Sequence, residues 1–311
     1  MPKVLISDSM STVAQKIFEK NNISVDVKTS LSEEEIIKII PDYDGIVVRS
    51  ATKVTKNIME AAKNLKVIGR AGAGVDNIDV NYAKSKKIIT INTPGGNTNA
   101  TAEHTFALLF SVYRNIGEAN ASTHKGLWEK KKFKGFELRE KKIGLIGFGN
   151  VSSRVAEIAN NLNMKVFTFS NSFSSKKSNF PYVKQLDLNS LISSCDIISF
   201  HCKPQSDGKT IINESHFKKM KKNLVIINTA RGNLIDELSL KNALNNNLIY
   251  GAGIDVFSSE PAKNNILFGT KNLILTPHIA ASTHEAQINV AIQVAREMSE
   301  FFKSGKVKNS V

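Results

Sequence analysis

One stretch constrains what this chain can fold into more than any other. Residues 141–152 read Lys-Lys-Ile-Gly-Leu-Ile-Gly-Phe-Gly-Asn-Val-Ser, an apolar run followed at once by a glycine-rich turn. Apolar residues then recur at helical spacing from Val151 to Leu162. A strand, a glycine turn and a helix are the setting in which a dinucleotide-binding fingerprint is meaningful. The stretch predicts a nucleotide site, but an ordinary strand-to-helix turn has the same pattern.

Each position of this turn has a physical role in the nucleotide interpretation. Gly147 permits the tight turn, and Gly149 lets a pyrophosphate approach the backbone. The amides of Asn150 and Val151 open the helix and face the anion. Ser152 stands where the fingerprint has its third glycine, a position that serves helix–strand packing more than phosphate contact. We expect a small outward shift of the helix there, without loss of binding.

The rest of the chain alternates short apolar strands with helices, which is typical of parallel sheets covered on both faces. We predict an α/β protein with two doubly wound parallel-sheet domains. Two long helices are expected, over residues 99–121 and 283–303. Strands are expected at residues 4–7, 25–27, 45–48, 67–69, 88–91, 165–169, 197–201, 224–228, 250–255 and 273–276.

The position of the glycine turn sets the expected domain organisation. The first strand of the chain is followed by Asp8-Ser-Met-Ser and not by a glycine loop. We therefore expect a Rossmann-type nucleotide domain, residues 98–282, inserted into a flavodoxin-like substrate-binding domain. That second domain comprises residues 1–97 plus 283–311.

The composition of the chain limits where the protein is expected in the cell and which partners it is expected to bind. No apolar run approaches the ~20 residues of a membrane span, and the N-terminus lacks the layout of a signal peptide. Cys195 and Cys202 flank an apolar strand and are interpreted as core thiols of a cytoplasmic protein. The formal net charge is +14, but the lysines are scattered, and residues 130–134 form the one dense cluster. We expect neither a nucleic-acid partner nor a membrane partner.

Three side chains of complementary chemistry follow neighbouring predicted strands. Arg231, Glu260 and His278 come after the strands that end near residues 228, 254 and 276. Ligands in open α/β sheets lie beyond the carboxyl ends of the strands. The three side chains are therefore expected to converge at one edge of the sheet. The remaining histidines His104, His124, His216 and His284 are interpreted as surface residues.

Here the chain resembles the D-isomer-specific 2-hydroxyacid dehydrogenases over nearly its whole length. Two stretches, Arg49-Ser-Ala-Thr-Lys-Val54 and the Gly-Arg-Ala-Gly of residues 69–72, favour the phosphoglycerate-oxidising branch, in a short form without a regulatory domain. The resemblance implies an oxidoreductase that transfers a hydride between D-3-phosphoglycerate and a nicotinamide cofactor in serine biosynthesis. The other stretches that carry it are residues 73–79, 92–97, 228–232, 255–261 and 277–283.

The three converging side chains suit the oxidation of a 2-hydroxy acid. A proton must leave the hydroxyl as hydride leaves C2, and a histidine titrates near the working pH, so His278 is the expected general base. Glu260 would orient its ring and stabilise the imidazolium. Arg231 can grip the substrate carboxylate with two hydrogen bonds. No metal is expected.

The resemblance also implies contacts for the other ligand groups. Backbone amides from Gly72 onward can hold the second carboxylate oxygen, and the basic residues would bind the phosphate. The expected substrate-binding residues are Arg49, Ser50, Arg70, Gly72, Ala73, Gly74 and Lys130. The expected cofactor-binding residues are Gly147, Gly149, Asn150, Val151, Ser170, Cys202, Thr229, Ala230, Arg231, Asp255, His278 and Ala280.

Two departures from the family pattern bear on the cofactor. Ser170 stands where NAD-dependent members usually carry an acid, and Lys203 stands where proline is more frequent. Without that acid nothing repels a 2′-phosphate, and Lys176 or Lys177 lies close in sequence. We expect NAD(H), with NADP(H) accepted as well.

Several alternatives stay open. The same chemistry would serve a glyoxylate or hydroxypyruvate reductase that uses NAD(P)H. The same fold and catalytic set also occur in nucleotide-sensing corepressors, which are binding modules. A homodimer is expected, because a long helix and the loop around Trp128 would otherwise expose apolar surface.

Overall fold

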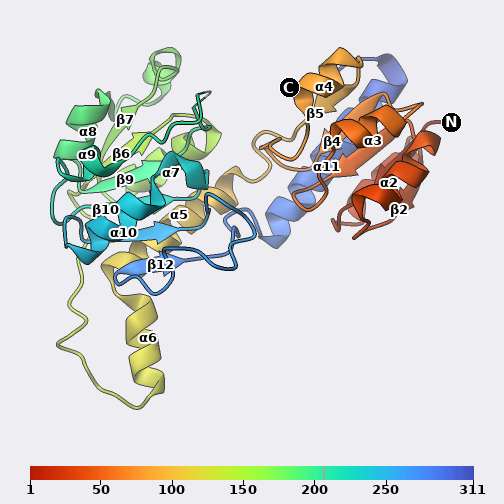
Figure 1. The fold of residues 1–311 in the computed structure, drawn as a ribbon. Coiled ribbons are helices and arrows are strands. Elements are labelled where there is room, and N and C mark those ends of the chain that lie inside the picture. The colour runs from red at the N-terminus through yellow and green to blue at the C-terminus, as the bar shows by residue number, and fades with distance from the viewer. Residues whose placement is uncertain (206) are drawn as a thin grey trace. The chain divides into compact units, whose positions relative to one another are not determined.

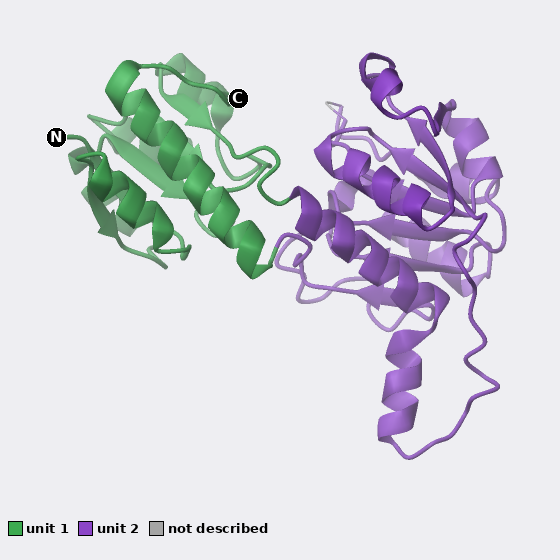
Figure 2. Cartoon of the chain, turned by 180° about the vertical axis from the view of Figure 1, so that it is seen from behind, with its two compact units in different colours: residues 1–97, 282–311 green, residues 98–281 purple. Residues whose placement is uncertain are grey.

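The computed structural model describes residues 1–205 and 207–311 and divides into two compact units (Figures 1 and 2). Unit 1 comprises residues 1–97 and 282–311, and unit 2 comprises residues 98–281. Unit 2 is therefore inserted into the chain of unit 1. The division differs from the boundary expected from sequence by one residue, Ser282.

Unit 1 is built on a five-stranded parallel sheet in the order β2-β1-β3-β4-β5. The chain order is β1 (Lys3–Ile6), α1 (Val13–Lys20), β2 (Ser24–Val27), α2 (Glu33–Ile39), η1 (Ile40–Asp42), β3 (Gly45–Val48), α3 (Lys56–Ala61), β4 (Val67–Arg70), α4 (Val80–Ser85), β5 (Ile89–Ile91) and, after unit 2, α11 (His284–Ser304).

Helices cover both faces of this sheet, as its apolar strands require. On one face the core includes Phe18 of α1 and Val294 and Met298 of α11. On the other face it includes Ile36 of α2 and Ile58 of α3. The last helix of the chain thus completes the core of the first strands.

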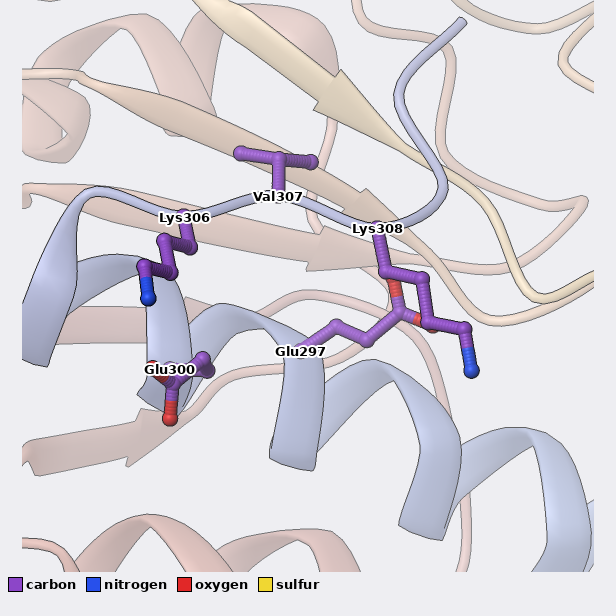
Figure 3. A pocket seen from close by; sticks show the side chains of 5 residues that line it. All are labelled: Glu297, Glu300, Lys306, Val307 and Lys308. Carbon is purple, nitrogen blue, oxygen red and sulfur yellow. The ribbon is translucent and has the colours of Figure 1, made fainter.

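The segment after α11 closes the edge of the sheet. It runs antiparallel to β5, with a bridge between Ile91 and Ser310 and a hydrogen bond from the Val311 amide to the Thr90 carbonyl. A hollow of about 300 Å³ lies between α11 and this segment. Figure 3 shows the side chains that line it, none of which is a predicted site residue: Glu297, Glu300, Lys306, Val307 and Lys308.

Unit 2 is built on a seven-stranded parallel sheet in the order β12-β11-β10-β9-β6-β7-β8. Its strands are β6 (Lys142–Ile146), β7 (Lys165–Phe169), β8 (Val183–Gln185), β9 (Ile197–Phe200), β10 (Val225–Asn228), β11 (Gly251–Ile254) and β12 (Leu273–Leu275). Its helices are α5 (Thr98–Tyr113), α6 (Ile116–His124), α7 (Asn150–Asn161), η2 (Ser174–Asn179), α8 (Leu188–Ser194), α9 (Glu214–Phe217), η3 (Gly232–Leu234) and α10 (Glu237–Asn245).

This sheet also has a core on each face. Side chains of α8, α9 and α10 pack against one face, and side chains of α5 and α7 pack against the other. The predicted α/β class with two doubly wound parallel sheets is thereby confirmed. Among the described residues no helix is long and apolar enough to cross a membrane.

The expectation of one helix over residues 99–121 was wrong. The helix is interrupted at Asn115, whose φ of 52° lies in the left-handed region. Asparagine tolerates this conformation better than most residues, so the break has a local cause. α5 stays on the sheet, whereas α6 and the loop after it extend away from it (Figure 1).

Candidate active site

Arg231, Glu260 and His278 lie on the loops that follow three adjacent strands, β10, β11 and β12. Nδ1 of His278 lies 2.6 Å from Oε2 of Glu260. The other carboxylate oxygen of Glu260 accepts a hydrogen bond from the Phe257 amide at 2.9 Å. Glu260 is thus held from its own loop and holds the imidazole in turn, which leaves Nε2 of His278 for a substrate.

The contact between His278 and Glu260 raises the pKa of the imidazole and lowers the pKa of the carboxyl group. The hydrogen bond that the imidazole donates to Glu260 raises the pKa of His278 above its ordinary value, against an opposing effect of burial and of Arg231. Burial works to raise the pKa of Glu260, but its hydrogen bond with His278 and the amide of Phe257 outweigh it and hold that pKa low. Both shifts favour the ion pair of imidazolium and carboxylate.

Arg231 is fixed by its own loop. The side-chain amide of Asn228 donates to the Arg231 carbonyl at 2.8 Å, and Nη1 of Arg231 donates to the Ala230 carbonyl at 2.6 Å. Gly232 packs so closely on the neighbouring loop that a Cβ there would lie 1.9 Å from the backbone of Phe257. The loop that carries Arg231 is therefore in direct contact with the loop that carries Glu260.

Asp255 organises the loop of His278. Its fully buried carboxylate accepts hydrogen bonds from the amides of Ile279 and Ala280, both at 2.9 Å, and from the Thr276 hydroxyl at 2.6 Å. Burial works to raise the pKa of Asp255, but these hydrogen bonds and one from His104 outweigh it and lower the pKa. The carboxylate stays ionised in an apolar setting because its oxygens are satisfied.

His104 was wrongly interpreted as a surface residue. Its side chain, 18% exposed, projects from α5 to within 3.5 Å of the Asp255 carboxylate and 3.1 Å of the Thr276 hydroxyl. The sequence separation from Thr276 is 172 residues, so no local pattern could have revealed this contact. Asn228 and Gly232 were also missed, although both lie in a stretch that carried the family resemblance.

Two glycines shape the turn between β6 and α7. Gly147 has a φ of 91°, and a Cβ on it would lie 2.7 Å from the His201 carbonyl oxygen. A Cβ on Gly149 would meet no protein atom within 4 Å. α7 begins at Asn150, and its N-cap residue Gly149 supplies no side-chain cap, so the first amides of the helix have no capping side chain.

Ser152, the departure from the fingerprint, takes part in the turn. Its side chain is fully buried, and its hydroxyl donates a hydrogen bond to the Gly147 carbonyl at 2.8 Å. The serine therefore ties the first turn of α7 to the glycine that precedes it.

The segment after β7 approaches the same turn. The ammonium of Lys176 donates to the Phe148 carbonyl, between the two glycines, at 3.3 Å. The hydroxyl of Ser170 lies 3.1 Å from that of Ser172, and the Ser170 carbonyl accepts from the Gln185 side chain. A lysine and two hydroxyls thus stand near the end of the strand where NAD-dependent members of the family carry an acid.

Cys202 lies on the opposite side of the turn. Burial raises the pKa of its thiol to about 11, so the thiol is neutral and unreactive at physiological pH. Burial also lowers the pKa of the adjacent His201 to about 3, and the ring bonds the Ser199 hydroxyl at 2.8 Å. Cys195 and Cys202 are both free thiols.

Within unit 1, a buried carboxylate builds the loop of Arg49 and Ser50. Asp8 accepts hydrogen bonds from the amide of Arg49 at 2.6 Å and from the hydroxyl of Thr52 at 2.6 Å. The side-chain amide of Asn77 donates to the carbonyls of Arg49 and Thr52. Neither Asp8 nor Asn77 was recognised from sequence as a support of this loop.

The other predicted substrate-binding residues lie at the end of β4 and on the loop that follows it, and on the loop after α6. The guanidinium of Arg70 covers Gly72, since a Cβ at Gly72 would meet Nη1 of Arg70. Ala73 and Gly74 continue the same loop, and Lys130 is exposed on the loop after α6. Among the described residues no cluster of histidine, cysteine or carboxylate side chains could hold a metal ion.

Comparison with known proteins gives the family. Residues 106–280 match the D-isomer specific 2-hydroxyacid dehydrogenase, NAD binding domain. A D-3-phosphoglycerate dehydrogenase of Archaeoglobus fulgidus is 42% identical over 99% of this chain and 59% of its own length. A hydroxypyruvate reductase of Thermotoga maritima is 41% identical over 95% of this chain and 97% of its own length.

A solved structure agrees with these matches over the whole chain. An acyclic imino acid reductase in complex with NADPH and D-Arg has a TM-score of 0.88 and 35% identity, over 99% of each chain. The chain spans only 59% and 54% of the length of the first two phosphoglycerate dehydrogenases that it matches. The domain match and the full-length relatives together show that this chain belongs to the D-isomer specific 2-hydroxyacid dehydrogenase family.

Proposed function

We propose that this chain interconverts D-3-phosphoglycerate and 3-phosphohydroxypyruvate by hydride transfer with a nicotinamide cofactor, as a step of serine biosynthesis. The observation that carries the proposal is the 2.6 Å contact between His278 and Glu260, next to the loop of Arg231. In the oxidative direction Nε2 of His278 takes the proton of the C2 hydroxyl, and a nicotinamide cofactor held at the glycine turn would supply the acceptor for the hydride of C2. Arg231 binds the substrate carboxylate and keeps C2 oriented.

The phosphate of the substrate is assigned to basic residues. Asp8 accepts a hydrogen bond from the backbone amide of Arg49, and the Ser9 carbonyl accepts one from its guanidinium. Because the side chain is already held, it loses less rotamer freedom when it binds a phosphate. We assign the phosphate to Arg49, Arg70 and Lys130, and the carboxylate to Arg231 and the amides of residues 72–74. The relatives named as phosphoglycerate dehydrogenases support this substrate.

The cofactor is assigned to the glycine turn, with NAD(H) and NADP(H) both accepted. Ser170 brings no negative charge to the end of β7, and Lys176 already reaches the Phe148 carbonyl of the turn. An ammonium here can pair with a 2′-phosphate. Asp255, Thr229, Ala230 and Ala280 are assigned to the nicotinamide side.

A homodimer is assigned to the surface of α6 and the loop that follows it. Trp128 is 87% exposed. Ile116 at the start of α6, and Leu127 and Phe136 on the loop that follows α6, are also exposed. Apolar surface of this kind on an arm that leaves its own sheet is typical of subunit contacts. The dimer is tested by sedimentation of the protein and of a Trp128→Ser variant, which should dissociate more readily.

A hydroxypyruvate reductase is the second candidate, favoured by a relative that matches over 97% of its length. The deciding experiment measures kcat/KM for phosphohydroxypyruvate, hydroxypyruvate and glyoxylate, each with NADH and with NADPH. Phosphohydroxypyruvate should be the best substrate. Arg49→Gln should raise its KM and leave that of hydroxypyruvate unchanged. A better rate with hydroxypyruvate, unaffected by Arg49→Gln, would establish the reductase instead.

A binding module without turnover is the third outcome of the same experiment. NADH would then bind without reduction of any of the three 2-oxo acids. Turnover that His278→Ala abolishes, with NADH binding retained, excludes this outcome.

A further inference from the structure

A chain of hydrogen bonds joins α5 to the loop of the catalytic histidine. Nε2 of His104 lies 3.1 Å from the hydroxyl oxygen of Thr276, and this hydroxyl lies 2.6 Å from Oδ1 of Asp255. The contacts link a helix to the ends of two neighbouring strands, β11 and β12. No part of the proposed reaction uses His104 or Thr276.

The donors in this chain can be assigned from the chemistry of the groups. An ionised carboxylate only accepts, so the single hydroxyl proton of Thr276 points to Asp255. The hydroxyl oxygen of Thr276 is then free to accept only, and Nε2 of His104 must carry a proton and donate it. The order is therefore His104 to Thr276 to Asp255.

Asp255 in turn binds the backbone of the loop that carries His278. Its two carboxylate oxygens accept from the amides of Ile279 and Ala280, and its carbonyl accepts from the amide of His278 at 2.8 Å. His278 itself has a φ of 53°, in the left-handed region that a residue with a side chain rarely adopts. A backbone of this kind persists only where its surroundings fix it, and here the surroundings are Asp255.

We propose that His104 is a positioning residue for His278, acting through the Asp255 carboxylate, which it approaches directly at 3.5 Å and also reaches through the Thr276 hydroxyl. It touches neither Glu260 nor the imidazole of His278. It fixes the carboxylate around which residues 276–280 are wrapped, and so fixes the direction of Nε2 of His278. The role in turnover rests on the proposed function, whereas the positioning itself can be measured in the protein without substrate.

The first test compares three substitutions with one control. His104→Leu and Thr276→Val remove the donor and the relay, whereas His104→Gln keeps an amide donor near the position of Nε2. His284 is exposed at the start of α11, so His284→Leu is the matched control. His104→Leu and Thr276→Val should each lower kcat about tenfold or more, the size of loss expected when a catalytic group is displaced. The KM for the 2-oxo acid should change little.

The pattern of effects separates positioning from general damage. His104→Gln should recover most of kcat, and His284→Leu should not change it. The double variant His104→Leu with Thr276→Val should lose less than the two single variants combined, because both substitutions act on the same carboxylate, that of Asp255. Equal kcat in the wild type and in both single variants would overturn the proposal. If His104→Leu does not fold, Thr276→Val and His104→Gln decide the question by the same criteria.

The second test follows the imidazole of His278 by NMR titration in the cofactor-free protein, with His278→Ala to identify its signals. The charged groups that act on it are Glu260, Asp255 and Arg231. When the loop is released, His278 loses part of its contact with Glu260 and Asp255, so its pKa should fall toward the ordinary value in His104→Leu. An unchanged titration would overturn the proposal.

The two tests distinguish the failure of each idea. A shifted titration in a protein that reduces no 2-oxo acid would refute the proposed function and retain the positioning. Turnover in the wild type, with neither kcat nor the titration changed in His104→Leu, would refute the positioning and retain the function.

Discussion

The hydrogen bond between Nδ1 of His278 and Oε2 of Glu260 sets the protonation of the site more than any other contact. It raises the pKa of the imidazole above 6.5 and holds that of the carboxyl low. Reduction of a 2-oxo acid needs the imidazolium, whereas oxidation of a 2-hydroxy acid needs the neutral ring. A raised pKa keeps the proton on His278 and so favours reduction near neutral pH.

The first prediction concerns this pH dependence. The kcat/KM for reduction should fall as pH rises through the pKa of His278, above 6.5, and the kcat/KM for oxidation should rise over the same range. Glu260→Gln removes the largest cause of the shift, so both midpoints should move to lower pH. Rate profiles in both directions measure this, with exposed Glu118→Gln as the control. Midpoints that stay in place in Glu260→Gln would contradict the assignment.

Arg231→Lys tests the grip on the carboxylate. A lysine keeps the charge but cannot form two parallel hydrogen bonds with a carboxylate. We expect kcat/KM to fall by about ten- to a hundredfold, the scale of losing one hydrogen bond to a charged group. Steady-state kinetics measure it, and Arg139→Lys, exposed after α6, is the control. Full activity in Arg231→Lys would mean that Arg231 contributes charge alone.

The two glycines of the turn should respond differently to the same substitution. Gly147→Ala places a Cβ 2.7 Å from the His201 carbonyl with a left-handed φ, and it should destabilise the protein by about 1–3 kcal/mol. Gly149→Ala meets nothing within 4 Å and should leave the melting temperature unchanged while weakening cofactor binding. Thermal unfolding and NADH titration measure the two effects. Tight NADH binding in Gly149→Ala would remove the pyrophosphate from this position.

Ser152 offers a test of the third fingerprint position. Ser152→Ala removes a buried hydrogen bond of 2.8 Å to the Gly147 carbonyl and should cost about 1 kcal/mol of unfolding free energy. Ser152→Gly restores the fingerprint but adds the helical cost of glycine, about 1 kcal/mol more. Urea unfolding of the three proteins gives the order. A Ser152→Gly variant more stable than the wild type would show that the serine strains the turn.

Cofactor preference should depend on the segment after β7. Ser170→Asp should favour NADH, because a carboxylate repels the 2′-phosphate of NADPH. Lys176→Ala should raise the KM for NADPH more than that for NADH, because it removes the ammonium near Phe148. Lys177→Ala, an exposed neighbour, is the control. Equal changes for both cofactors in Lys176→Ala would assign the lysine to the turn alone.

The sequence predicted the parts of this fold that have a one-dimensional signal. β3 and β7 begin and end at the predicted residues. β3 is a continuous buried run, as expected of a parallel strand covered on both faces, and β7 is rich in β-branched and aromatic residues. β8 was missed because its three residues are Val183, Lys184 and Gln185, of which the last two are exposed at the edge of the sheet. Its pairing with β7 depends on tertiary contacts that a single sequence does not display.

The site residues, too, differ in whether the sequence alone could reveal them. Residues that follow strands, such as Glu260 and His278, could be found because parallel strands bring their ends together. His104 lies on a helix among apolar residues, and its contact is visible only after α5 is packed on the sheet. Asp8 is similar, since its role depends on Thr52, 44 residues further on.

The return of α11 to unit 1 determines when each core can form during synthesis. All strands and helices of unit 2 lie within residues 98–281, so that unit can complete its core as soon as it leaves the ribosome. The strands of unit 1 are made first, but the core against Val294 and Met298 must wait for residues 284–304. One apolar face of the first sheet thus stays uncovered until unit 2 has been made, and until then it is exposed to intermolecular contacts.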